Sequence, residues 1–224
     1  MYKYLLILSI NLLLAITSNL FAQSYDLNEV DIELRRIYRD DQQIRLKLNE
    51  LTKASMELAE LMVMISINDE MKLIDAKNQK YVSDLLDKYG WPNNLSDSAN
   101  AAIFLVIDHG DKSYSEKYFE MVTEKANQGI ISKSFAATLE DRILMRSNKP
   151  QKYGTQTKSS ISNTNTENVI YIWPIQDPEK VDELRTSVEL PPINTYIQMM
   201  GDILQMKVVW DKNLSVSDLA EQIP

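Results

Sequence analysis

The sequence contains no cysteine and only one histidine, His109. Without cysteine the chain can form no disulfide and offers no thiol nucleophile, so packing alone must stabilise the fold. A single histidine without cysteine is also a poor supply of ligands for zinc, which prefers nitrogen and sulfur donors. We therefore expect neither a metal nor another cofactor.

Familiar catalytic motifs are missing as well. The sequence has no nucleophile elbow, phosphate-binding loop, HExxH helix or EF-hand loop. Its 24 basic residues face 32 acidic ones, which gives a formal net charge of −8. This acidic balance argues against nucleic acid and anionic membranes as partners. The composition alone does not decide whether the protein is an enzyme.

Only one apolar run is long, and it lies in residues 1–22. Lys3, the apolar stretch after it and the small residue Ala22 are typical of a signal peptide cleaved after Ala22. The run of about 18 residues is marginal for a membrane span. We expect export to the periplasm or medium, without stable membrane insertion after cleavage. Residues 23–205 should form a single mainly helical domain, and 206–224 a partly ordered C-terminal extension.

Hydrophobic spacing predicts a mainly α fold, a bundle of about six to seven helices with a small β-hairpin near residues 151–175. Apolar residues three and four apart predict one helix over 26–65. A break at Ser66–Asp69 would then precede a second helix over 70–89.

Caps, glycines and prolines delimit the other predicted helices, at 97–109, 113–128, 132–147, from Pro178 onward and from Pro191 onward. The run "AAIFLVI" is apolar on every side and favours a central buried helix, with a β-strand as the alternative. In the hairpin, "KSSISNTNTEN" is predicted to be a polar loop at the tip.

Polar residues interrupt the apolar seams of the first two helices. Asp41 stands where a leucine would fit, and Arg45 lies one turn further on the same side. Asp75 and Asn78 turn towards the interior from the second helix. Burying an unpaired carboxylate is costly, so these residues predict either a polar cavity or a structural ion pair between helices.

His109 ends the most apolar helix and is the first candidate for acid–base catalysis near neutral pH. The alternative is a histidine that only caps this helix. Asp41 or Asp141 would orient the imidazole. Asp141 and Arg142 are adjacent, so they point in directions about 100° apart and share a pocket only if their helix is covered on two sides.

The segment "QKYGTQ", residues 151–156, contains no aliphatic side chain. We predict that it crosses a polar site as a short strand. Gly154 would allow close approach of the backbone, and it and Thr155 could offer amides to an oxyanion. Tyr153 would form a wall, and directional hydrogen bonds would come from Gln151 and Gln156.

In chain order these positions form one series: Asp41-Gln42-x-x-Arg45, Asp75-x-x-Asn78, Gly90-Trp91-Pro92, His109, Asp141-Arg142, Gln151-x-Tyr153-Gly154-Thr155-Gln156 and Val181-Asp182-x-x-Arg185. The series resembles the bacterial domain of unknown function family 6624 over roughly residues 30–200. The resemblance supplies no reaction, but it implies that these polar residues belong to one recurring set. Asp108 departs from the pattern, which has glutamine before the histidine.

Three functions remain open at this stage. The first is an enzyme acting on a small polar or anionic substrate, with His109 as general acid or base and with Arg45, Arg142 or Arg185 binding the substrate's charge. The second is a non-catalytic module that binds such a ligand. The third is a structural or interaction protein that uses buried ion pairs to fix its helices. The sequence does not determine the oligomeric state.

Overall fold

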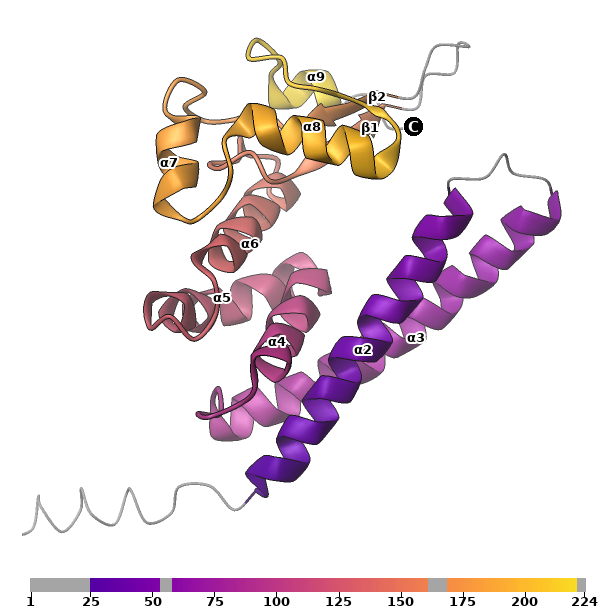
Figure 1. The fold of residues 1–224 in the computed structure, drawn as a ribbon, viewed down its shortest axis with the longest axis vertical. Coiled ribbons are helices and arrows are strands. Elements are labelled where there is room, and N and C mark those ends of the chain that lie inside the picture. Colours follow the sequence, from indigo (N-terminus) through magenta and orange to yellow (C-terminus); the bar gives the residue numbers. More distant parts are fainter. Residues whose placement is uncertain (1–24, 53–57, 161–168, 221–224) are drawn as a thin grey trace, which may run out of the picture.

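The computed structural model describes residues 25–52, 58–160 and 169–220 (Figure 1). The predicted signal peptide and the tip of the predicted hairpin lie outside these residues. Among the helices described, none is both long enough and apolar enough to span a membrane. The mainly α fold predicted from the sequence is confirmed.

The N-terminal part is a hairpin of two long helices, α2 (Leu27–Thr52) and α3 (Leu58–Tyr89), which pack against each other (Figure 1). The predicted break at Ser66–Asp69 is wrong, because α3 runs through it. Asn and Asp are frequent helix caps, but here Asp69 stays helical and pairs with Lys72 at 3.0 Å. Helix α2 ends at Thr52 and α3 begins at Leu58, so the predicted first helix over 26–65 is divided earlier than expected.

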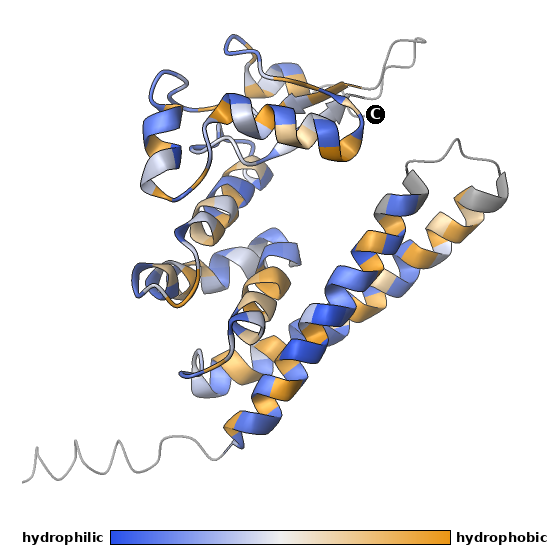
Figure 2. Ribbon diagram, viewed as in Figure 1, coloured by the Kyte–Doolittle hydropathy of each residue, from blue (hydrophilic) through white to orange (hydrophobic). Residues whose placement is uncertain are grey.

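The first half of α3 is apolar on more than one side, and α2 covers only part of it. Five large apolar side chains of this half are exposed: Leu61, Met62, Val63, Ile65 and Leu73. Figure 2 shows the hydrophobic colouring continuing along α3 toward the end of the hairpin. The second half is better packed, since Val82, Leu85 and Leu86 are buried against the rest of the core.

Helix α4 (Asp97–His109) is the central helix of the core and excludes the strand interpretation of its apolar run. The Ser96 hydroxyl caps its start by accepting from the Ala99 amide. Helix α4 contacts α2, α3, α5 (Lys112–Asn127) and α6 (Lys133–Arg146), as the contact pattern and Figure 1 show. Because it ends in the middle of this cluster, the side chains at 108 and 109 face two different neighbouring helices.

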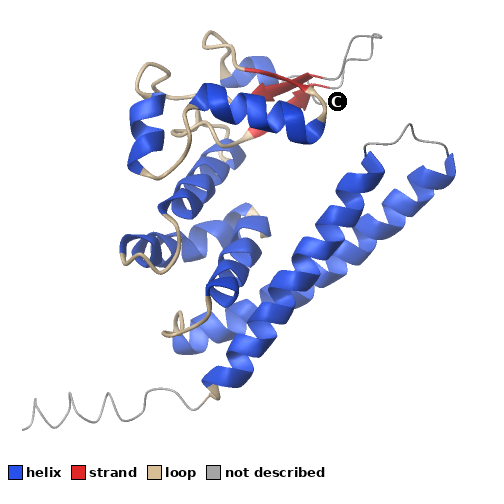
Figure 3. Cartoon of the chain, in the orientation of Figure 1, coloured by secondary structure: helices blue, strands red, loops and turns tan. Residues whose placement is uncertain are grey.

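The C-terminal part carries a small sheet with strand order β1-β2-β3 (Figure 3). Strand β1 (Thr157–Ser160) pairs antiparallel with β2 (Val169–Ile172), so the predicted hairpin is confirmed, but residues 158–160 are strand and not loop. Parallel pairing adds β3 (Lys207–Val209) to β2. Around the sheet lie α7 (Val181–Ser187), α8 (Ile193–Leu204) and α9 (Val216–Ala220).

Two details of this region differ from the prediction. Helix α7 begins at Val181 and not at Pro178, because residues 178–180 form a turn that the Lys180 amide closes onto the Asp177 carbonyl at 3.2 Å. The tail after Met206 contributes β3 and α9, which its short apolar runs did not signal. The sheet therefore has a third strand from the predicted extension.

Candidate functional site

His109 and Asp41 form the central contact of the site. The His109 Nδ1 lies 3.0 Å from the Asp41 Oδ1, although 68 positions separate the two residues. The Asp41 side chain is 2% exposed and the His109 side chain 19%. Within the described part of the chain, the His109 Nε2 has no hydrogen-bond partner. One edge of the ring is therefore fixed from α2, and the other is free.

Arg45 bonds the same Asp41 oxygen as His109 and connects α2 to α3. Its Nη2 is 3.0 Å from the Asp41 Oδ1 and 2.8 Å from the Asp75 Oδ1. Its Nε donates to the same Asp41 oxygen at 3.1 Å, and Gln42 donates to the second oxygen at 2.8 Å. Helices α2, α3 and α4 thus meet in one cluster of charged groups, as the seam positions of Asp41 and Asp75 suggested.

Burial alone would raise the pKa of Asp41, but its hydrogen bond to His109, together with the charges of His109 and Arg45, lowers that pKa to about 2. Asp41 therefore stays ionised at neutral pH. An ionised carboxylate can only accept hydrogen bonds, so it favours the histidine tautomer that carries its proton on Nδ1.

Asn78 is buried one turn after Asp75 on α3, and its Nδ2 has no hydrogen-bond partner among the described residues. Arg45 contacts both Asp41 on α2 and Asp75 on α3. Because the two helices are antiparallel, the residue one turn after Asp75 on α3 lies level with the residue one turn before Arg45 on α2, which is Asp41. Asn78 therefore belongs to the wall behind the Asp41–His109 pair. A buried donor without an acceptor is rare in folded proteins and marks this point of the wall as unusual.

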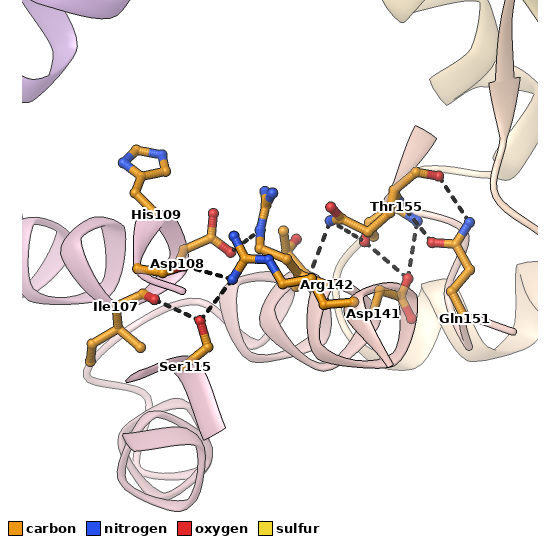
Figure 4. A network of polar contacts seen from close by, with 12 residues as sticks. Ile107, Asp108, His109, Ser115, Asp141, Arg142, Gln151 and Thr155 are labelled. Atoms are coloured by element: carbon orange, nitrogen blue, oxygen red, sulfur yellow. Dashed lines mark hydrogen bonds and ion pairs between the residues drawn. The ribbon is translucent and has the colours of Figure 1, made fainter. Parts of the chain in front are cut away.

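A second cluster joins the end of α4 to α6. The Arg142 Nε donates to the buried Asp108 carboxylate at 2.7 Å, and the Arg146 Nη1 donates to the Gly110 carbonyl at 2.7 Å and to Ser115 at 3.1 Å. Figure 4 shows His109 and Arg142 projecting to the same side of their helices. Asp108, whose role the sequence left in doubt, thus anchors Arg142.

Asp141 is fully buried and, as Figure 4 shows, lies beside Thr155 and away from His109. It accepts from the amides of Lys152, Tyr153 and Thr155 at 2.7–3.1 Å, and from the Thr155 hydroxyl at 2.9 Å. Burial raises the pKa of Asp141, and these hydrogen bonds oppose that effect. The geometry gives Asp141 no contact with His109, so only Asp41 orients the imidazole.

The "QKYGTQ" segment is a turn and not the predicted strand. Residues 152–154 curve around Asp141, with Gly154 at a φ of 72°, and pairing resumes only at Thr157. The Thr155 amide is occupied by Asp141 and cannot serve an oxyanion. Gln151 is fully buried, and its side chain bonds backbone groups of Gln156 and Trp173 at 2.6–3.0 Å.

Arg185 is fully buried and completes the support of this turn. Its Nη1 donates to the Tyr153 and Gly154 carbonyls at 2.7 and 3.3 Å, and its Nε donates to the Pro191 carbonyl at 2.6 Å. The remaining Nη2 has no hydrogen-bond partner in the part of the chain that the structure describes. Gly154 packs so closely that an added Cβ would lie 2.9 Å from two isoleucine methyl groups, so no ligand fits between them.

The predicted residues therefore fall into two groups. The first group lies between α2, α3 and α4 and consists of His109, Asp41, Arg45, Asp75 and Asn78. Arg142 lies beside this group through Asp108, the chain neighbour of His109. The second group is a separate cluster that joins α6 to the C-terminal part. It consists of Asp141, Gln151, Tyr153, Gly154, Thr155, Gln156 and Arg185.

Two residues of the site were not singled out from the sequence. Arg146 follows Arg142 by one helical turn, and this spacing was its available signal. Gln42 stood in the quoted motif next to Asp41 but was given no role, and it proves to bond that carboxylate.

One cavity of about 610 Å³ lies elsewhere, between the start of α4 and the α5–α6 turn. Its walls include Tyr38, Ala101, Ile131, Phe135 and Lys133. None of the residues predicted for the site lines it. Size alone is weak evidence of function, so the His109 cluster remains the candidate site on its chemistry.

Comparison with known proteins gives the family but no activity. Neither the search of curated proteins nor that of solved structures returned a significant match. Residues 28–209, most of the chain, match the profile of a family of unknown function, DUF6624. The resemblance noted from the motifs is thereby confirmed, and the chain belongs to the DUF6624 family.

Proposed function

We propose that the protein is an exported enzyme that carries out acid–base chemistry at His109 on a small polar or anionic substrate. The observation that supports this most directly is the 3.0 Å contact between the His109 Nδ1 and the buried Asp41. A histidine fixed in this way presents the lone pair of Nε2 to a substrate and can accept a proton there. The same nitrogen can return the proton in a later step.

The surroundings of Asp41 suit it to orient the histidine. Two hydrogen bonds from Arg45 and Gln42 fix the carboxylate, so it cannot rotate away from the imidazole. Its low pKa keeps it from taking the histidine's proton, so the imidazolium that forms during turnover is stabilised and not discharged. Asp41 is therefore a positioning residue, and His109 is the group that touches the substrate.

The proposal can be tested first by the state of the ring. His109 is the only histidine, so the protein purified with a histidine-free tag gives one pair of ring nitrogen signals in a 15N NMR spectrum. We expect the neutral ring to carry its proton on Nδ1, and to lose this preference in Asp41→Leu. A neutral ring protonated on Nε2 in the wild-type protein would contradict the proposal.

The second test is turnover on a panel of phosphate esters, carboxylate esters, amides and small glycosides. Activity should fall at least about 100-fold in His109→Gln, the range typical of a lost general base. Asp41→Asn should lower kcat more than it changes KM, because the carboxylate does not touch the substrate. If a substrate is found that His109→Gln turns over at the wild-type rate, the assignment fails.

A non-catalytic binding module is the second candidate, favoured by the unpartnered buried amide of Asn78. A thermal-shift screen with anionic metabolites and cell-wall fragments separates the two. A compound that stabilises the wild-type protein but is never converted favours binding over catalysis. Export is tested by sequencing the N-terminus of the protein recovered from the periplasm or medium, which should begin after Ala22.

A further inference from the structure

Three arginines were candidates for holding the charge of a ligand, and the structure leaves one of them free to do so. Arg45 bridges Asp41 and Asp75, so its charge is matched within the protein. Arg185 is fully buried against backbone carbonyls. Arg142 is 28% exposed and bonds only through its Nε. Its two Nη groups have no hydrogen-bond partner in the described part of the chain.

Asp108 anchors the Arg142 guanidinium at one end. Asp108 is 5% exposed and accepts from the Nε at 2.7 Å, so the guanidinium is anchored at its Nε and its far end carries the two Nη groups. Asp108 and His109 are consecutive, with Cα atoms about 3.8 Å apart. Figure 4 shows that the Arg142 and His109 side chains extend to the same side. The free end of Arg142 and the free edge of the His109 ring therefore open to the same side of the molecule.

Two arginines and two aspartates make up the charge cluster around Arg142. Burial and then the positive charge of Arg142 lower the pKa of Arg146, so the two guanidinium groups sense each other. Asp108, which pairs with Arg142, and Asp111 both act on Arg146 in the opposite sense, so two carboxylates accompany the two guanidinium groups. Asp111, the next carboxylate along the chain, is committed to capping α5 through the Tyr114 amide at 2.8 Å.

We propose that Arg142, oriented by Asp108, binds a planar or tetrahedral oxyanion of the ligand, a carboxylate or a phosphate. This inference rests on the proposed function for the identity of the neighbouring site, and it narrows the substrate class to small oxyanions. Two parallel Nη–H···O bonds would form, the arrangement in which arginine is stronger and more selective than lysine. Asp108 is a positioning residue that acts through Arg142.

The experiment titrates inorganic phosphate and, separately, acetate into the full chain at constant ionic strength maintained with chloride. Calorimetry gives the affinity, and the ring signals of His109 report whether the anion binds beside it. We expect saturable shifts of the His109 signals with one of the two anions, which also distinguishes phosphate from carboxylate. Arg142→Lys should weaken this binding at least about tenfold.

Arg39→Lys is the matched control, because Arg39 is an exposed arginine of α2 paired only with Asp40 at 3.6 Å. It should leave affinity and His109 shifts unchanged. Equal weakening in both variants would indicate general charge screening and overturn the proposal. Binding in Arg142→Lys as tight as in the wild-type protein would overturn it too, as would the absence of any saturable shift.

Asp108 is tested by two substitutions of similar size. Asp108→Asn keeps an oxygen that can accept from the Arg142 Nε, so it should retain anion binding, whereas Asp108→Leu removes the acceptor and should weaken binding at least about fivefold. Circular dichroism and the unchanged Asp41–His109 signals establish that both variants are folded. Wild-type affinity in a folded Asp108→Leu protein would remove Asp108 from the proposal.

The two proposals fail in different ways. Oxyanion binding that depends on Arg142, with no turnover of any substrate, would uphold the anion site and refute the enzyme. Turnover that depends on His109, with KM unaffected by Arg142→Lys, would uphold the enzyme and refute the anion site.

Discussion

Asp141 and Arg185 bind the same turn, Asp141 through the backbone N–H groups and Arg185 through the carbonyl groups. Asp141 accepts hydrogen bonds from the amides of Lys152, Tyr153 and Thr155, and Arg185 donates to the carbonyls of Tyr153 and Gly154. Together they satisfy backbone groups that a tight buried turn would otherwise leave without partners. The polar residues of "YGT" are therefore architectural, and they attach the C-terminal part to α6.

Replacing Asp141 should be among the most destabilising changes in the chain. Asp141→Leu removes the acceptor for four donors of the turn, and we expect a loss of about 3–4 kcal/mol in the free energy of unfolding. Thr155→Val removes only one of these hydrogen bonds and should cost about 1 kcal/mol. Urea unfolding measures both. Equal losses in the two variants would show that the carboxylate does not support the turn as a unit.

Gly154 should tolerate alanine less well than Gly90, although both have a φ of 72°. The backbone strain is shared and costs about 1 kcal/mol at each position. Only at Gly154 would the added methyl lie 2.9 Å from Ile175 and Ile193, while nothing lies within 4 Å at Gly90. Gly154→Ala should therefore lose at least about 1 kcal/mol more than Gly90→Ala in the same unfolding assay.

The stability of the protein should depend on pH through Asp41. Its pKa is about 2 in the folded state against an ordinary value of 3.8, so the ionised form stabilises the fold. This contribution, about 2 kcal/mol, is fully present above pH 4 and is lost as the pH falls towards 2. Asp41→Asn should be less stable at neutral pH and lose less on acidification. Parallel curves for the two proteins would contradict this account.

Arg45 and Arg36 offer a matched comparison on α2. Arg36 pairs with Glu33 and Asp40 on the same helix, whereas Arg45 connects α2 to Asp75 on α3. Arg45→Ala leaves the buried Asp41 with one fewer partner and should cost about 2–3 kcal/mol, while Arg36→Ala should cost less than about 1 kcal/mol. Thermal unfolding followed by the α-helical circular dichroism signal measures the loss of stability in each variant, and equal losses would contradict this comparison.

The sequence predicted the core of the fold well because its signals are local. The caps and glycines around α4, α5 and α6 are sufficient to delimit these helices. The break at Ser66–Asp69 was misplaced because Asn and Asp are also tolerated inside a long helix that packs on a partner. Strand β3 could not be predicted, since its three residues depend on pairing with the distant β2.

Only the part of the candidate site that local sequence signals mark could be predicted. An aspartate in an apolar seam signals a buried partner, so Asp41, Arg45 and Asp75 could be placed together from one helix pattern. The pairing of Asp41 with His109 joins residues far apart in the chain, and periodicity carries no information about it. Asp141 was predicted as an alternative partner of His109, but it bonds the 152–155 turn, whereas His109 bonds Asp41.

The contact between Asp41 and His109 also has a consequence for how the protein folds. Its two residues belong to the N-terminal hairpin and to the central helix, which meet only when α2 docks on α4. Such non-local contacts form late, because the loop between them must close first. The imidazole therefore acquires its orientation only in a chain whose hairpin has already docked. The ring signals of His109 would report that docking step during refolding, independently of any ligand.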